Sequence, residues 1–320
     1  MTMTLDAAFF ARLSRLRLAM GHKASMNLTG NRKSTQKGSS TEFSDFREYM
    51  PGDDIRRIDW NAYGRLDRLY VKEYMEEKEA VVSILIDTSA SMAYGQQPDR
   101  PSANIAGTPH LAAPAYKKSE CACMLAAAFA YMGLNNMDRV ILYDMRQMQQ
   151  PFSASGGKHA LPGLADWLSQ RTFEAGVDVN EAVRQLPMKG PGVTMIISDF
   201  LQESFVDADR EQETVRKLLR FLAYRKQKTA LLHVLAGEEI SPGVSAELVG
   251  TRNLIDMEEK SALRLTLDAA SIRVYEQAVQ AFLSGLRAEC ARMGAFYAVC
   301  GADKDIDQLI FRELRKLYDI

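Results

Sequence analysis

A chain of 320 residues, 47% hydrophobic and 25% charged, has the composition of a globular protein with room for one large domain and a smaller one. Its 40 basic residues against 41 acidic ones give a net charge of −1, which excludes nucleic-acid binding driven by bulk charge. No apolar run approaches the roughly 18 residues that span a bilayer, and the N-terminus lacks a signal-peptide layout. The four cysteines lack disulfide or metal spacing. We therefore expect a cytoplasmic protein with reduced thiols and no membrane span.

The segment before residue 80 divides into two parts. Residues 1–24 carry apolar side chains at every third or fourth position, which predicts an amphipathic N-terminal helix. Residues 25–79 contain alternating polar and apolar positions around a Pro-Gly-Asp-Asp turn, which predicts a small antiparallel β subdomain. A short β element makes residues 240–260 a candidate addition to it. Residues 80–320 form the main domain.

The main domain alternates apolar strands with amphipathic helices. Continuous apolar strands between such helices are typical of a mostly parallel sheet covered on both faces, so we expect a doubly wound, Rossmann-like α/β fold. A Pro-rich loop occupies 95–114, a length typical of functional or mobile segments. Strands are expected at 80–87, 139–143, 193–198, 230–235 and 296–300, and helices at 116–134, 158–170, 178–186, 209–226, 267–293 and 306–317.

Polar side chains follow two of the expected strands. Asp87-x-Ser89-x-Ser91 comes after the first strand, and Asp199 follows a later one. In an open α/β sheet, ligands sit beyond the carboxyl ends of the strands, where we expect Asp87 to be exposed. Carboxylates and hydroxyls are hard oxygen ligands that suit Mg²⁺. A helix cap is the alternative role for these residues, but the next expected helix begins only after the Pro-rich loop.

A catalytic site is the other alternative. Phosphotransferases with an aspartate nucleophile on such a strand need a second acid two residues later, where this chain has Ser89. The chain contains no phosphate-binding loop, dinucleotide fingerprint, nucleophile elbow or H-E-x-x-H zinc motif. Its four histidines are dispersed. The residues therefore favour a binding role over catalysis.

Two features carry a resemblance to known families. Asp87-x-Ser89-x-Ser91 with Ser198-Asp199 resembles the metal-ion-dependent adhesion site of von Willebrand factor type A domains. The block EFSDFREYMPGDDIRRIDW at 42–60, with the later LAAAFAYMGLNNMDRV and MIISDF, is similar to the bacterial domain of unknown function 58 family. The resemblance covers roughly residues 25–320 and implies a von Willebrand factor type A-like fold for the main domain.

The resemblance implies a non-enzymatic, metal-dependent protein-interaction module. Members of the family are usually encoded beside MoxR-type AAA+ ATPases, which implies an adaptor or chaperone-like partnership with such an ATPase. The resemblance assigns Mg²⁺ or Mn²⁺ to Asp87, Ser89, Ser91 and Asp199, with an open position for an acidic residue of a partner protein. A metal-independent interaction module with a degenerate site is the first alternative, and a metal-dependent phosphohydrolase or nuclease is the second.

One departure from the family pattern affects the metal site. Where the family has a Gly-Gly-Thr-Asp segment, this chain has Ala175-Gly176-Val177-Asp178, and Val177 offers no oxygen in place of the Thr. Asp178 is then a candidate for supporting the metal from a greater distance. Its other interpretation is the N-cap of the helix that follows.

The 42–60 block has two interpretations. Its charges alternate in sign, which is typical of an ion-pair network that holds a β subdomain together. The alternative is a docking face for the ATPase partner, for which the candidate residues are Asp53, Asp54, Arg56 and Arg57.

Overall fold

The chain divides into two compact units: Met1–Ala24 with Ala80–Ile320, and Ser25–Glu79. The computed structural model describes residues 7–18, 41–76, 80–95, 116–188, 190–201, 208–241, 250–255 and 262–319. Apart from Gly95, the Pro-rich loop expected at 95–114 lies outside the described residues.

A six-stranded sheet forms the centre of the larger unit, and it confirms the expected mostly parallel α/β fold. Neighbouring strands run parallel except for β5 and β6, which pair antiparallel. The short β6 was not expected, because its polar sequence FSAS lacks the apolar run of the central strands. In sheet order the strands are β11 (Phe296–Gly301), β8 (Gln227–Leu235), β7 (Gly192–Ser198), β4 (Val81–Ile86), β5 (Arg139–Asp144) and β6 (Phe152–Ser155).

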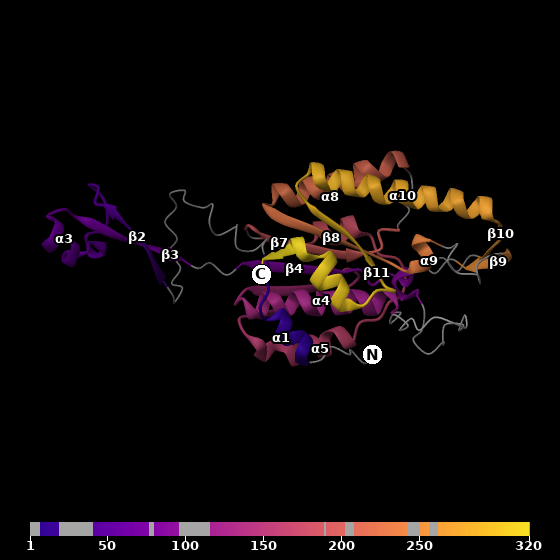
Figure 1. The fold of residues 1–320 in the computed structure, drawn as a ribbon, viewed down its shortest axis with the longest axis horizontal. Coiled ribbons are helices and arrows are strands. Elements are labelled where there is room, and N and C mark those ends of the chain that lie inside the picture. Colours follow the sequence, from indigo (N-terminus) through magenta and orange to yellow (C-terminus); the bar gives the residue numbers. More distant parts are fainter. Residues whose placement is uncertain are drawn as a thin grey trace. The chain divides into compact units, whose positions relative to one another are not determined.

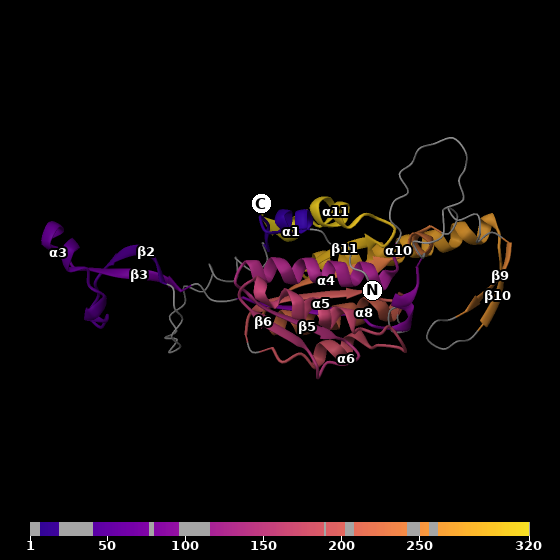
Figure 2. The same cartoon turned by 90° about the horizontal axis from the view of Figure 1, so that it is seen from below.

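Helices cover both faces of this sheet, as Figures 1 and 2 show. Successive residues of a strand point to opposite faces, so Ile84 and Ile86 enter one apolar core while Leu85 enters the other. The first core contains α1 (Ala7–Leu13), α4 (Lys118–Asn135), α5 (Leu161–Ser169) and the C-terminal turns, which include α11 (Ile306–Gln308). The second contains α6 (Val179–Arg184), α8 (Ala208–Tyr224) and α10 (Ala269–Arg292). All four cysteines are buried and free. None of the described helices combines the length and apolarity needed to cross a bilayer.

The N-terminal helix belongs to the larger unit. Helix α1 ends at Leu13, and the chain continues as β1 (Arg17–Leu18), which pairs antiparallel with β12 (Tyr318–Asp319). Leu16 and Leu18 are buried in the first core, so the apolar periodicity continues after the helix has ended. The two strands thereby pair a segment near the start of the chain with one near its end.

A short helix and a hairpin follow β8. Helix α9 (Gly237–Ile240) comes directly after the strand, and β9 (Gly250–Ile255) pairs antiparallel with β10 (Ala262–Leu267). The hairpin contains the short β element read from the sequence. It belongs to the larger unit and not to residues 25–79, because β10 leads directly into α10.

The smaller unit contains the expected antiparallel hairpin, with a helix that was not expected. Strand β2 (Thr41–Glu48) pairs with β3 (Tyr70–Glu76), and a bulge interrupts the register between Phe43 and Asp45. Between them lie the 3₁₀ turn η1 (Ile55–Arg57) and helix α3 (Trp60–Leu66). Asp59 caps α3 through its side chain, which accepts from two backbone N–H groups of the first turn.

Candidate functional site

The candidate site lies where the strand order of the sheet reverses. Counted along the chain, the six strands are arranged 3-2-1-4-5-6, so β4 and β7 are adjacent while their connections leave in opposite directions. In doubly wound sheets this switch point is where ligands bind, beyond the carboxyl ends of the strands. Asp87 follows β4 and Asp199 follows β7, and the Asp87 N–H donates to the carbonyl of Ile197 at 2.9 Å. The fold therefore brings the two predicted carboxylates to one place.

Asp87 is fully buried, whereas the sequence placed it at an exposed strand end. Its Oδ2 accepts the Ser198 hydroxyl at 2.5 Å and its Oδ1 accepts the Ser89 N–H at 2.9 Å. Burial, together with repulsion from Asp199, raises the pKa of Asp87 from 3.8 to about 6. The nearby cations of the described residues pair elsewhere, Lys118 with Asp199 and Arg171 with Asp144. Asp87 is thus a buried carboxylate without a cationic partner among the described residues.

The two serines of the loop lie together. Ser89 is buried, Ser91 is half-buried, and their hydroxyl oxygens are 2.9 Å apart. The 3₁₀ turn η2 (Ala90–Ala93) begins between them, and Ser89 occupies its N-cap position without a side-chain capping bond. The two hydroxyls therefore form a hydrogen-bonded pair beside the Asp87 carboxylate.

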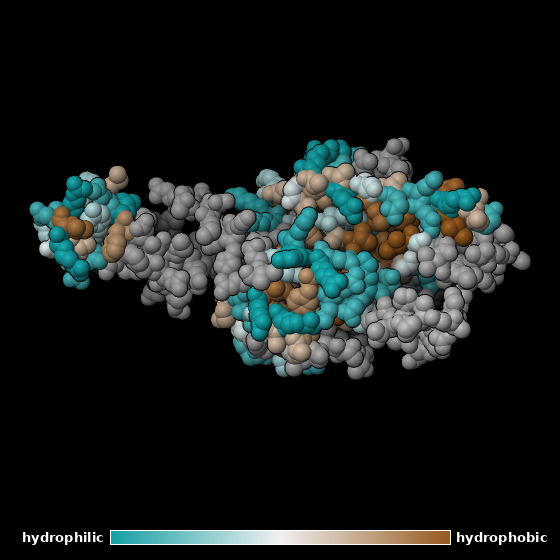
Figure 3. All heavy atoms as spheres, viewed as in Figure 1, coloured by the Kyte–Doolittle hydropathy of each residue, from teal (hydrophilic) through white to brown (hydrophobic). Residues whose placement is uncertain are grey.

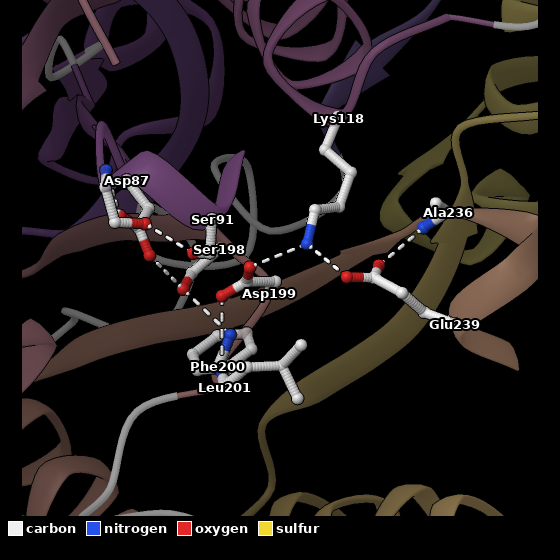
Figure 4. Close-up of polar contacts among 10 residues, drawn as sticks. Asp87, Ser91, Lys118, Ser198, Asp199, Phe200, Leu201, Ala236 and Glu239 are labelled. Carbon is white, nitrogen blue, oxygen red and sulfur yellow. Dashed lines mark hydrogen bonds and ion pairs between the residues drawn. The ribbon is translucent and has the colours of Figure 1, made fainter. Parts of the chain in front are cut away.

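A buried ion triad adjoins the Asp87 loop (Figure 4). Lys118 Nζ donates to Asp199 Oδ2 at 2.8 Å and to Glu239 Oε1 at 2.6 Å, and its side chain is fully buried. Asp199 Oδ1 accepts the Leu201 N–H at 3.2 Å, so both carboxylate oxygens of Asp199 contact donors. Sequence reasoning missed Lys118 and Glu239, because 121 residues separate them and no short motif joins them.

A third strand end also carries an acid that sequence reasoning missed. Asp144 is the last residue of β5 and is buried. Its Oδ1 accepts the Thr88 hydroxyl at 2.5 Å, and its Oδ2 accepts Arg171 at 3.2 Å. Asp144 therefore holds the Asp87 loop through Thr88 and has its own cation. The sequence RVILYD contained the signal, an acid directly after an apolar run.

The segment 171–178, called the third loop below, lies beside the Asp87 loop. The Ala90 N–H donates to the Ala175 carbonyl at 2.8 Å, and the Glu174 N–H donates to the Thr88 carbonyl at 3.1 Å. Val177 is half-buried and packs against the second core. Asp178 is exposed, and its carboxylate accepts from two N–H groups at the start of α6, so it serves as the N-cap.

Whether these residues fit a metal ion depends on the serine hydroxyls, because the described site has too few carboxylates to hold an ion by themselves. No group of three or more His, Cys, Asp or Glu side chains within the described ranges is arranged to hold one. The donor set here consists of one buried carboxylate and two adjacent hydroxyls, all hard oxygen ligands. An Mg²⁺ ion commonly keeps several waters and takes few protein ligands, so this donor set fits such an ion.

The two acidic candidate docking residues of the smaller unit are engaged within that unit. Asp53 accepts from Arg47 at 3.0 Å and from the Met50 N–H at 2.8 Å, and this pair holds the pKa of Asp53 below its usual value. Asp54 caps η1, and Arg56 is exposed. The side chain of Arg57 lies outside the described ones.

The smaller unit also exposes large apolar side chains. Trp60 is 64% exposed, and helix α3 buries none of its residues within the described part of the chain. Figure 3 shows apolar and polar patches interleaved on this unit. The exposed apolar residues here are Phe46, Met50, Ile55, Trp60, Tyr63 and Leu66.

Comparison with known proteins gives a family. A family model described as Protein of unknown function DUF58 matches residues 45–282. Uncharacterized proteins of Mycobacterium tuberculosis and Mycobacterium bovis are 27% identical to this chain over 203 residues, which cover 61% of the chain. The chain spans 58% of the length of these relatives. Because the family model covers more than half of the chain, the protein belongs to the DUF58 family.

Proposed function

We propose that this protein is a non-enzymatic, metal-dependent protein-interaction module with a von Willebrand factor type A-like domain. The observation that carries the proposal is the buried Asp87 carboxylate at the switch point, which lies beside the hydrogen-bonded pair of Ser89 and Ser91 hydroxyls and has no cationic partner among the described residues. An uncompensated buried charge is costly, and a bound cation would remove that cost.

The charges around the site favour a divalent cation. Asp87, Asp199 and Glu239 are carboxylates, and Lys118 is the one ammonium in contact with this group among the described residues. When all are ionised, two negative charges remain unbalanced. Asp87, Ser89 and Ser91 would hold Mg²⁺ or Mn²⁺, and Asp199 would support it through its charge. When bound, the metal would offer an open position to an acidic side chain of a partner.

We propose a MoxR-type AAA+ ATPase as the partner, in line with the family resemblance, and the cytoplasm as the location. The four buried, free cysteines favour a reducing compartment. Exposed apolar residues such as Trp60, together with Arg56, supply a second contact surface of the composition found at interface centres. In this proposal Asp53 and Asp54 keep that surface in shape through their internal hydrogen bonds.

The test is a pull-down with a MoxR-type AAA+ ATPase from the same organism, which this proposal expects to be encoded beside the protein. We expect capture in Mg²⁺ and its loss in EDTA, and we expect the double variant Ser89→Ala, Ser91→Ala to behave in Mg²⁺ as the wild type does in EDTA. Ser153→Ala, on the exposed face of the edge strand β6, serves as the matched control. Equal capture in Mg²⁺ and EDTA would contradict the proposal.

Metal-independent interaction on the same fold is the second candidate. The half-buried Val177 offers no oxygen, and the Asp178 carboxylate is occupied as a helix cap, so the third loop contributes no side-chain ligand. This candidate predicts capture of the ATPase that EDTA leaves unchanged.

The non-enzymatic assignment rests on the catalytic motifs that the sequence lacks and on the ionisable side chains beside Asp87. Lys118 is held between two carboxylates, and the nearby His233 is fully buried, which lowers its pKa to about 4. A screen for phosphatase and nuclease activity tests the assignment, with Asp87→Ala as the control. Activity that disappears in this variant would make the protein an enzyme.

A further inference from the structure

Lys118 is placed against the local preference of its helix. It is the first residue of α4, and the N-terminus of a helix carries partial positive charge, which disfavours a lysine there. Its side chain is nevertheless fully buried, where an ammonium is tolerated only when paired. A residue that breaks a local rule at a buried position is a candidate for function.

The surroundings of Lys118 fix its position. Its backbone N–H donates at 3.0 Å to the carbonyl of Tyr94, the residue that follows η2 at the end of the Asp87 loop. Its ammonium lies 5.9 Å from the centre of the Tyr94 ring. The Glu120 carboxylate accepts the backbone N–H of Lys117 and so fixes the start of α4. Lys118 is thus tied to the proposed metal loop by backbone and side chain.

The Lys118 ammonium donates to two carboxylates from different elements, Asp199 and Glu239. Asp199 follows β7 and repels Asp87 directly, which is one cause of the raised pKa of Asp87. Glu239 lies in α9, where its Oε2 accepts the Ala236 N–H at 2.8 Å and its carbonyl accepts the Tyr275 hydroxyl at 3.0 Å. Glu239 is therefore anchored on the side of the ammonium opposite to the Asp87 loop (Figure 4).

We propose that Lys118 is a built-in counter-cation that sets the affinity of the Asp87 site for divalent metal, and that Glu239 controls how strongly it does so. The inference rests on the proposed metal function. The ammonium cancels part of the negative charge that Asp199 presents to a metal at Asp87, Ser89 and Ser91. Glu239 also binds the ammonium, so the ammonium cancels less of the negative charge on Asp199. Lys118 is a positioning residue in this scheme and not a metal ligand.

The test measures Mg²⁺ and Mn²⁺ binding by isothermal titration in the full chain at pH 7.5. We expect Lys118→Met to raise metal affinity by at least about tenfold, because it removes a positive charge from a low-dielectric site. We expect Glu239→Gln to lower the affinity by about tenfold, because the ammonium then pairs with Asp199 alone and cancels more of its negative charge. Lys118→Arg keeps the charge and serves as the conservative control, with affinity close to that of the wild type.

A double variant separates this role from a structural one. Because Glu239 acts through Lys118, Glu239→Gln should change metal affinity by less than about threefold in the Lys118→Met background, and the difference is the coupling between the two residues. The melting temperatures of the variants, measured in EDTA and with Mn²⁺, give a second test that does not depend on titration. Lys118→Met leaves the buried Asp199 and the half-buried Glu239 carboxylates without their partner, so its melting temperature should fall in EDTA and rise with Mn²⁺ by more than that of the wild type.

The outcomes separate the two proposals. Metal binding in the wild type with unchanged affinity in Lys118→Met or Glu239→Gln would overturn the role of Lys118 and leave the metal site standing. A folded Lys118→Met variant with weakened metal binding would likewise overturn it. If Lys118→Met does not fold, Glu239→Gln decides alone. Absence of binding in the wild type and all variants would overturn the metal function, and the role of Lys118 with it.

Discussion

Replacement of Asp87 by Asn should stabilise the metal-free protein at neutral pH. Burial and the neighbouring Asp199 raise the pKa of Asp87 from 3.8 to about 6, so the native state holds this proton more tightly than the unfolded chain does. The ionised carboxylate therefore destabilises the native state increasingly between pH 4 and pH 6. At about 1.4 kcal/mol per pKa unit, the full cost above pH 6 is about 3 kcal/mol.

The Asn variant removes this cost and keeps most of the hydrogen bonds. Its amide oxygen can still accept the Ser89 N–H. Its NH₂ group would donate to the Ser198 hydroxyl oxygen, which reverses the direction of the wild-type hydrogen bond. Rearranging that bond costs about 1 kcal/mol, so the net gain at pH 7 is about 2 kcal/mol. Near pH 3.5 the carboxyl is neutral in both states, and the variant should be equal to or slightly less stable than the wild type.

The assay is urea unfolding in EDTA from pH 3.5 to 7.5, followed by circular dichroism. The expected result is a difference in unfolding free energy that grows between pH 4 and pH 6 in favour of the variant. Addition of Mg²⁺ should then stabilise the wild type only. A variant that is less stable than the wild type at pH 7, or a difference that does not depend on pH, would refute this reasoning.

Three further substitutions test separate parts of the site. Val177→Thr restores a hydroxyl in the third loop and should raise metal affinity in isothermal titration; unchanged affinity would mean that this loop does not reach the metal. Asp178→Ala should lower the unfolding free energy by about 1 kcal/mol through the lost N-cap and leave metal affinity unchanged, whereas weakened metal binding would make Asp178 part of the site. Burial lowers the pKa of His233 from 6.5 to about 4, so the native state binds this proton less readily and the wild type should lose up to about 3 kcal/mol as the pH falls from 6.5 to 4. His233→Phe should remove that part of the acid dependence in urea unfolding, and an identical pH profile would contradict the assignment.

Sequence reasoning could locate the site because its signals are local. The central strands are apolar runs, and the acids after β4 and β7 come next in the chain, so the fold and the meeting of Asp87 with Asp199 followed from strand order. The short β6 and helix α3 were missed, the first because its sequence is polar and the second because a Pro-Gly-Asp-Asp turn suggested a plain hairpin. Asp59 was the local signal for α3, as an N-cap.

The electrostatics of the site could not be predicted in the same way. Lys118, Asp199 and Glu239 come from a helix, a strand end and the short helix α9, and the first two are 81 positions apart. Only the folded chain shows that an ammonium already lies beside the proposed metal loop. Burial of Asp87 was also misjudged, since a strand end at a switch point can be covered by the turns that follow it.

The central claim is that Asp87, Ser89 and Ser91 bind a divalent cation, and isothermal titration of the chelator-treated protein with Mg²⁺ and Mn²⁺ tests it most directly. The double variant Ser89→Ala, Ser91→Ala is the comparison, with Ser153→Ala as the control. We expect one saturable site in the wild type and the control, and loss of binding in the double variant. No binding in the wild type, or equal binding in the double variant, would contradict it.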